Sequence, residues 1–437
     1  MITTLAQLRA GLPAGTRQLK MSCGLTEFPR EIFNLADTLE SLDLSGNALS
    51  SLPDDLPRLA KLRIIFCSNN RFTELPEVLG KCQQLSMIGF KANQIARVAG
   101  TSLPATLRWL ILTDNHVEML PPEIGNCTKL QKLMLAGNRL RTLPSALAAC
   151  SRLELLRLAA NQLDELPAWL TSMPRLSWLA YAGNPLSETL EADALIHTPI
   201  NPIEWSDLTL EHVLGEGASG VIYRASYSTN DGAAQPVAVK LFKGAVTSDG
   251  LPHCEMAACI NAGEHGNLIS VLGKVRAHPQ GSDALVLTLI DPEFRNLAGP
   301  PSLDSCTRDM YADGVRFTRW AALNMAYGIA SAACHLHAKG IMHGDLYAHN
   351  ILHCGESRAL LGDFGAASFY SPQGPHAQSL QRLEVRAYGC LLEELIDRCD
   401  AVDPSLFELK NRCLSEKTDD RPLFDEIVSA LSTLMKT

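Results

Sequence analysis

Leucine and other apolar residues recur along residues 16–197 in one fixed pattern, with polar residues between them. The stretch LESLDLSGNALSSLP, which begins at Leu39, returns as LRIIFCSNNRFTELP at Leu62 and as LQKLMLAGNRLRTLP at Leu130. Asparagines mark the same place in successive copies, 22 or 23 residues apart: Asn47, Asn70, Asn93, Asn115, Asn138, Asn161 and Asn184. A period of this length indicates a repeat architecture.

Each copy fits L-x-x-L-x-L-x-x-N-x-L, which is the pattern of leucine-rich repeats. It predicts a short strand, a turn in which the asparagine amide satisfies backbone groups, and a convex segment after the Leu-Pro pair. A single coil cannot bury its own leucines, so about eight coils are expected to stack into a solenoid over residues 16–197, behind an N-terminal cap over residues 1–15. The fourth copy reads IARVAGTSLP and predicts an irregular convex side.

Residues between the leucines of the predicted strands form an apolar stripe on the concave face. An exposed apolar patch usually marks a partner site. We therefore predict that a protein substrate or partner, or the second half of this chain, binds there; the alternative is lateral packing between neighbouring strands. The stripe contains Ile64, Phe66, Met87, Trp109, Ile111, Met134, Leu155 and Trp178.

The repeat stops after residue 197, and a proline-containing linker over residues 198–204 precedes a new domain that begins at Trp205. The glycine-rich segment LGEGASG is followed by GVIYRASY, which is rich in β-branched and aromatic residues. This order predicts a strand hairpin, because a helix would follow the glycines of a dinucleotide-binding turn. Glycines at positions 215, 217 and 220 would let backbone N–H groups approach phosphates.

Composition excludes some classes of protein. The 437 residues are 46% hydrophobic and 19% charged, with a net charge of −9, which argues against a nucleic-acid or anionic-membrane binder. The chain has neither a bilayer-spanning apolar run nor a signal-peptide pattern at its start, so we expect a cytoplasmic protein with no membrane partner.

The 13 cysteines include no C-x-x-C pair, so the sequence predicts neither a disulfide framework nor a zinc site. Cys82, Cys127 and Cys150 recur at one place in the repeat, which indicates a buried packing position in a reducing compartment.

From Trp205 onwards, six motifs in order resemble those of eukaryotic-type protein kinases. They are the glycine loop, VAVK ending at Lys240, Glu255 in a following helix, ALVLTLIDPEF, HGDLYAHN from His343, and the Asp-Phe-Gly triplet at Asp363. The whole chain resembles bacterial leucine-rich-repeat protein kinases. The resemblance implies a two-domain fold: an α/β leucine-rich-repeat solenoid followed by a bilobal α+β protein kinase-like domain over residues 205–437.

The resemblance also implies a site for ATP and Mg²⁺ and phosphoryl transfer to protein hydroxyls, for which we favour serine or threonine over tyrosine. The implied catalytic residues are Asp345, Lys240 and Glu255, and the implied metal ligands are Asn350 and Asp363. Thr288 is expected at the back of the adenine pocket. The implied nucleotide-binding residues are Gly215, Glu216, Gly217, Ala218, Ser219, Gly220, Ile222, Ala238, Lys240 and Thr288.

HGDLYAHN departs from the kinase pattern. Gly344 replaces an arginine, Tyr347 replaces the lysine of serine/threonine kinases, and His349 stands where many tyrosine kinases carry arginine. We therefore expect activity that does not depend on phosphorylation of the activation segment. That segment is short, and Glu384 takes the place of the aspartate that usually opens the central helix. Two alternatives remain open: a nucleotide-sensing pseudokinase scaffold that acts through the repeats, and a small-molecule kinase.

Overall fold

The computed structural model describes residues 3–13, 15–228, 234–244, 246–355, 358–401 and 403–436. By contacts the chain divides into two compact units, Met1–Arg175 and Leu176–Thr437. The first contains leucine-rich repeats and the second resembles a bilobal kinase, so the predicted fold class is confirmed. The predicted domain limits follow the sequence pattern, whereas this division places the last repeat strand in the second unit.

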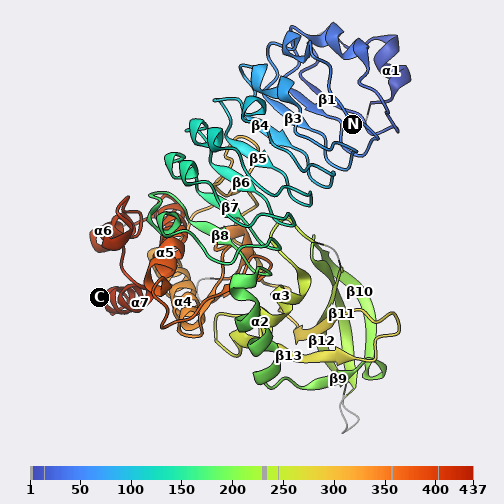
Figure 1. Cartoon of the computed structure of the whole chain (residues 1–437). Coiled ribbons are helices and arrows are strands. Elements are labelled where there is room, and N and C mark those ends of the chain that lie inside the picture. The colour runs from blue at the N-terminus through green and yellow to red at the C-terminus, as the bar shows by residue number, and fades with distance from the viewer. Residues whose placement is uncertain are drawn as a thin grey trace. The chain divides into compact units, whose positions relative to one another are not determined.

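The first unit is a stack of short parallel strands, visible in blue to green in Figure 1. Each strand pairs in register with the next, so that Leu42 of one coil faces Ile65 of the following coil. These inner positions are buried, as the leucine pattern requires. The strands are β1 (Gln18–Lys20), β2 (Ser41–Asp43), β3 (Ile64–Phe66), β4 (Met87–Gly89), β5 (Trp109–Ile111), β6 (Lys132–Met134) and β7 (Leu155–Arg157).

Short 3₁₀ helices form the convex segments of the coils. The irregular fourth copy has only the three-residue η4 and an extra bridge between Glu74 and Arg97. Before the first strand, α1 (Leu5–Ala10) begins with a capping box between Thr4 and Gln7. The convex helices are η1 (Arg30–Leu35), η2 (Leu56–Arg58), η3 (Glu77–Lys81), η4 (Gly100–Ser102), η5 (Pro122–Asn126), η6 (Ser145–Ala149) and η7 (Ala168–Ser172).

The asparagines bond backbone groups of two successive coils. Asn138 accepts the N–H of Val117 at 2.9 Å and donates to the carbonyl oxygens of Leu112 at 2.8 Å and Leu135 at 2.9 Å. Asn70 repeats this pattern with Leu49, Leu44 and Cys67. Since these groups lie inside the turn, the amide replaces partners that water cannot supply.

Replacing Asn138 with alanine is expected to lower the free energy of unfolding by about 2–4 kcal/mol, because three buried backbone groups lose a partner. Urea unfolding followed by circular dichroism measures the change. Arg139→Ala, at the exposed neighbouring position, is the control and should leave stability nearly unchanged. Equal stability of the two variants would contradict a structural role for the asparagines.

The apolar stripe is less exposed than the sequence predicts. Met87, Leu155 and Trp178 are buried, and the other members of the stripe are half-buried. Met87 lies between Ile64 and Trp109 of the adjacent strands, so lateral packing covers it. The expectation of an exposed stripe is therefore wrong for these three residues, and the half-buried members remain available for a partner.

The second unit begins with β8 (Trp178–Ala180) and α2 (Pro185–His197). Within the predicted linker, β9 (Pro202–Glu204) pairs in parallel with β13 (Val271–Arg276). It thereby becomes the edge of a six-stranded sheet in the order β10-β11-β12-β14-β13-β9. The other strands are β10 (Leu208–Glu216), β11 (Gly220–Ser228), β12 (Ala234–Phe242) and β14 (Ala284–Thr288), and α3 (Pro252–Ala262) packs beside them.

The rest of the second unit is mainly helical (Figure 1). Its longest helices are α4 (Arg319–Ala338) and α5 (Ala377–Ile396), followed by α6 (Pro404–Cys413), η10 (Thr418–Asp420) and α7 (Phe424–Leu434). Small sheets connect these helices to the loops of the site. They contain β15 (Arg295–Asn296), β16 (Ile341–Met342), β17 (Ile351–Cys354), β18 (Arg358–Leu361) and β19 (Ser368–Phe369). The short helix η9 (Ala348–Asn350) directly precedes β17, whereas η8 (Trp205–Asp207) lies between β9 and β10 of the larger sheet.

None of the thirteen cysteines, which all lie in the part of the chain that the structure describes, forms a disulfide. Cys82, Cys127 and Cys150 are buried, which confirms the predicted packing position. Among the described residues, no helix is both long and apolar enough to cross a bilayer.

Candidate active site

The glycine loop is the turn between β10 and β11, closed by a 2.9 Å bond from the Gly217 N–H to the Gly220 carbonyl oxygen. A Cβ at Gly215 or Gly217 would meet no atom within 4 Å, so the space beside the loop is open. A Cβ at Gly220 would lie 2.4 Å from the carbonyl oxygen of Leu241. The first two glycines thus leave room for a phosphate chain, and the third lets β12 approach closely.

Glu216, in the same loop, does not carry an isolated charge. Lys243 Nζ lies 2.7 Å from its carboxylate and also donates to the carbonyl oxygen of Gly217 at 3.1 Å. This lysine holds the pKa of Glu216 below its ordinary value. The pair anchors the glycine loop to the end of β12 without placing a free carboxylate beside the expected phosphates.

Lys240 of β12 and Glu255 of α3 form an ion pair between Nζ and Oε1. Their side chains are only 12% and 2% exposed. Burial alone would lower the pKa of Lys240, but the charges of Glu255 and Asp363 outweigh it and raise that pKa. The lysine is therefore a fixed cation close to Asp363.

Asp345 and Asn350 lie together in the loop between β16 and β17. Asn350 Nδ2 donates to the Asp345 Oδ2 at 2.8 Å and to its carbonyl oxygen at 2.9 Å. Both amide hydrogens are thus directed at Asp345, which turns the Asn350 Oδ1 away from it. Buried His343 supports the loop: its Nε2 donates to the Gly362 carbonyl oxygen at 2.8 Å, and its Nδ1 accepts the Asp345 N–H.

Asp363 follows β18 and adopts a left-handed backbone with φ of 54°. Its Oδ1 accepts the N–H of Gly365 at 3.1 Å, and the preceding Gly362 N–H donates to the Asn350 carbonyl oxygen at 2.9 Å. The two loops that carry Asn350 and Asp363 are therefore tied to each other. An amide oxygen and a carboxylate form the oxygen donor set that Mg²⁺ prefers, so these residues fit the ion.

His349 lies beside the loop and contacts Asp309. Its Nδ1 lies 2.7 Å from Asp309 Oδ1, and its backbone N–H donates to Asp309 Oδ2 at 2.9 Å. Burial alone would lower the pKa of His349, but Asp309, helped by Asp345 and Asp363, raises it. Asp309 could not be found from the sequence, because it lies 40 residues before His349 and belongs to no motif.

The sheet register fixes which side chains share the face of Lys240. Ile222 pairs with Lys240, and Ala238 pairs with Leu287, so all four lie on one face. Thr288 pairs with Val237 on the opposite face and is exposed. The register therefore places Leu287, rather than Thr288, on the face that carries Lys240, since a one-residue shift along a strand changes the face.

The last repeat strand, β8, packs against the catalytic loop within the second unit. The indole of Trp178 stacks on the Tyr347 ring, with centroids 4.1 Å apart and planes 7° from parallel. Its Nε1 donates to the Leu346 carbonyl oxygen at 3.1 Å. Tyr181 continues this contact, because its N–H donates to Ser368 Oγ at 2.9 Å and its hydroxyl donates to the Phe369 carbonyl oxygen at 3.2 Å.

This packing accounts for Gly344. Its φ is 72°, and a Cβ there would lie 2.7 Å from the Leu179 carbonyl oxygen and 2.5 Å from that of Ala366. An arginine at this position therefore has no space. Tyr347, where a lysine was expected, is the residue that meets Trp178. The two departures from the kinase pattern, Gly344 and Tyr347, are therefore the residues that contact β8.

Glu384 holds the same loop from α5. It lies inside that helix rather than at its start, and its Oε1 accepts the Gly344 N–H at 2.6 Å. Its Oε2 accepts the His343 N–H at 3.1 Å and lies 2.7 Å from the His337 ring. Burial alone would raise the pKa of Glu384, but His337 and the backbone N–H of Gly344 keep it below the ordinary value.

Ser368 and Tyr370 of the activation segment are buried, so their hydroxyl groups are not accessible for phosphorylation in this structure. Ser371 is exposed and Ser379 is half-buried.

Three stretches of the chain match known protein families. Residues 208–388 match the family described as protein tyrosine and serine/threonine kinase. Residues 105–163 and 38–59 match leucine-rich repeats. The chain thus combines stretches similar to leucine-rich repeats with a stretch similar to a protein kinase domain.

Curated relatives are similar over parts of the chain. Leucine-rich repeat and calponin homology domain-containing protein 1 of Mus musculus is 31% identical over 126 residues, covering 28% of this chain and 17% of that protein. Ephrin type-A receptor 5 of Gallus gallus is 26% identical over 288 residues, covering 55% and 27%. Probable serine/threonine-protein kinase pats1 of Dictyostelium discoideum is 33% identical over 119 residues, covering 25% and 4%. The chain spans between 4% and 27% of the length of these relatives.

Proposed function

We propose that this protein transfers the γ-phosphoryl group of ATP to protein hydroxyls with the help of Mg²⁺, preferring serine or threonine. The observation that carries the proposal is the formed Lys240–Glu255 pair together with Asp345, Asn350 and Asp363 on two joined loops. A fixed cation, a carboxylate base and an oxygen donor set are the parts that phosphoryl transfer requires.

The proposed chemistry assigns each group one task. Asp345 orients the acceptor hydroxyl and takes its proton as the oxygen attacks the γ-phosphorus. The bond between that phosphorus and the bridging oxygen breaks, and ADP leaves. Lys240 and the glycine-loop N–H groups hold the phosphates, and His349 near Asp345, whose pKa Asp309 raises, would add positive charge when it is protonated.

Asn350 and Asp363 would hold Mg²⁺, which when bound neutralises charge on the phosphates. The chain's own contribution is to keep these two ligands in place through the bonds Asn350–Asp345 and Gly362–Asn350.

The pseudokinase alternative rests on Gly344, Tyr347 and the short activation segment, and the packing of β8 gives the first two a structural reason. A residue required by packing is not a sign of lost catalysis. Contact with β8 also anchors Ser368 and Phe369, so the activation segment is held by Tyr181 without a phosphate group. This supports the proposal that activity does not depend on phosphorylation there.

We propose that the half-buried apolar residues of the repeats bind the protein substrate or a partner, since repeats present extended surfaces for such contacts. These residues are Ile64, Phe66, Trp109, Ile111 and Met134. A reducing compartment such as the cytoplasm suits a chain in which none of the thirteen described cysteines forms a disulfide. The bacterial relationship remains a proposal based on the resemblance alone.

The test is incubation of the full chain with Mg-ATP and a panel of proteins, followed by intact-mass measurement of every component. The native chain should add phosphate to itself or to a protein. Asp345→Asn should slow this by about 10²–10⁴-fold while still binding ATP. Asp313→Asn, which changes an exposed carboxylate elsewhere, is the matched control and should behave as the native chain.

Three outcomes would contradict the proposal. Equal transfer by the native chain and Asp345→Asn would remove Asp345 from the chemistry. ATP binding without transfer to any protein would favour the scaffold. Transfer to a metabolite alone would favour the small-molecule kinase.

A further inference from the structure

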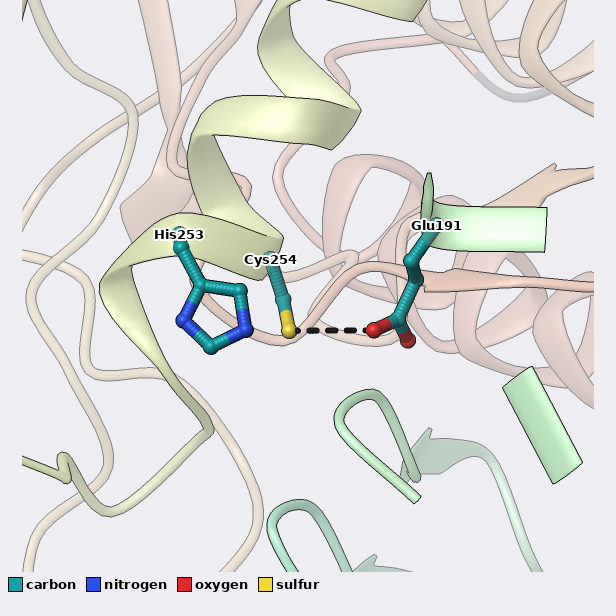
Figure 2. A group of neighbouring side chains, drawn as sticks. All are labelled: Glu191, His253 and Cys254. Atoms are coloured by element: carbon teal, nitrogen blue, oxygen red, sulfur yellow. Dashed lines mark hydrogen bonds between the residues drawn. The ribbon is translucent and has the colours of Figure 1, made fainter. Parts of the chain in front are cut away.

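A second cluster of ligand-type side chains lies apart from the phosphate-handling residues. Glu191 of α2 faces His253 and Cys254 in the first turn of α3 (Figure 2). Each residue offers one ligand atom, and these three atoms all lie within 4.8 Å of one another. The three side chains thus converge on one point between the two helices.

Glu191 is a buried carboxylate, only 7% exposed. Its Oε1 accepts the Gly183 N–H at 2.9 Å, and its Oε2 accepts the Cys254 thiol at 3.3 Å. In the part of the chain that the structure describes, no lysine, arginine or histidine forms an ion pair with it. A buried carboxylate without a counter-charge is costly, and a cation at the point of convergence would compensate it.

His253 is the solvent-exposed member of the cluster. Its ring is exposed and makes no hydrogen bond or ion pair with any other described residue, so it can turn towards a ligand without breaking a contact. Cys254 is buried, and burial together with Glu191 raises the pKa of its thiol. The Cys254 thiol donates to Glu191, and it would lose its proton to solvent when a metal binds.

We propose that Glu191, His253 and Cys254 bind a divalent cation of the zinc class, with water completing the coordination. One sulfur, one imidazole nitrogen and one carboxylate oxygen are the ligands that Zn²⁺ takes in proteins, whereas Mg²⁺ and Ca²⁺ prefer oxygen alone. The Gly183 N–H fixes one carboxylate oxygen and leaves the other directed at Cys254. Such a bond behind the ligand orients it for the metal.

The site would tie α2 to the beginning of α3, where the two helices already meet. Asn261 Nδ2 donates to the Ala194 carbonyl oxygen at 2.9 Å, and Thr198 Oγ1 donates to Asn261 Oδ1 at 2.7 Å. Cys254 directly precedes Glu255, the partner of Lys240. A bound cation would therefore hold the helix that carries the ion pair, at a place separate from Asn350 and Asp363.

The cysteine spacing gave no indication of this site and predicted that the chain has none. Glu191 lies 63 residues before Cys254, in a segment that belongs to the repeat pattern by sequence. Only the fold brings the three side chains together.

The first test is titration of the metal-free full chain with Co²⁺, which reports thiolate ligation through a near-ultraviolet charge-transfer band. The native chain should bind one Co²⁺ per chain and show this band. Added Zn²⁺ should displace the Co²⁺ and remove the band. Cys254→Ser should abolish the band, and Glu191→Gln and His253→Ala should weaken Co²⁺ binding by about tenfold or more. Cys259→Ser, in the same helix but outside the cluster, is the matched control and should retain the band.

Absence of the band from the native chain would overturn the proposal. Persistence of the band in Cys254→Ser would also overturn it, because another thiol would then be the ligand. Native Co²⁺ affinity in both Glu191→Gln and His253→Ala would do the same, because neither residue would then be a ligand. His253 is exposed, so its variant should fold, and a native thermal shift with ATP would confirm this. The proposal does not depend on phosphoryl transfer, which Asp345→Asn tests separately.

Discussion

Replacing Gly344 with arginine, the residue expected there in protein kinases, should destabilise the catalytic loop by about 4 kcal/mol or more. A side chain on a left-handed backbone costs about 1–2 kcal/mol by itself. Its Cβ would also lie within 2.7 Å of two backbone carbonyl oxygens, those of Leu179 and Ala366. Because both are backbone atoms, no rotation of a side chain can relieve the contact. Hydrogen exchange of peptides covering residues 341–370 measures the loss.

Gly344→Ala separates the Cβ contact from the guanidinium and should retain most of the effect. Gly314→Ala is the matched control: Gly314 also has a positive φ, of 75°, but a Cβ there meets no atom within 4 Å. Gly314→Ala should lower the free energy of unfolding only by the backbone strain of about 1–2 kcal/mol. Hydrogen exchange in the loop that contains Gly344 should not change. If arginine at position 344 were tolerated and raised transfer, the packing of β8 would not be the reason for the glycine.

Local sequence motifs identify most residues of the candidate site, but not the reason for Gly344. The identities of Lys240, Glu255, Asp345, Asn350 and Asp363 follow from motifs because each motif is local. The reason for Gly344 is not local, since Leu179 is 165 positions away in the chain. The sequence therefore marked the position as a departure but offered no physical cause for it.

The repeats could be predicted closely because their period is encoded in every copy. Asn70 and Asn138 bond as the pattern requires, and β1 to β7 follow at the predicted positions. Exposure of the concave stripe was harder to predict. The sequence shows that Met87 points out of its coil, but the neighbouring strands that cover it appear only in the folded stack. The face that Thr288 occupies could not be predicted for a related reason, because only the register of β14 shows it.

Replacing Trp178 with alanine should destabilise the second unit by about 3–5 kcal/mol and slow phosphoryl transfer more than it weakens ATP binding. Trp178 is 1% exposed, so its loss leaves a cavity against Tyr347 and removes the donor to Leu346. Both contacts lie within the loop that carries Asp345, whereas Lys240 and the glycine loop are elsewhere. We therefore expect kcat to fall and the KM for ATP to change little, together with faster hydrogen exchange over residues 341–350.

Two further variants divide this effect. Trp178→Phe keeps an aromatic ring on Tyr347 but loses the Nε1 bond, and should cost about 1–2 kcal/mol. Combining Trp178→Ala with Tyr347→Leu gives a double-mutant cycle in which ring stacking should appear as a coupling of about 0.5–1.5 kcal/mol. Trp109→Ala changes the same column of a different repeat and should leave exchange in the catalytic loop unchanged. If it altered the loop as strongly as Trp178→Ala, the effect would come from general loss of stability, and the last repeat strand would have no special role in positioning Asp345.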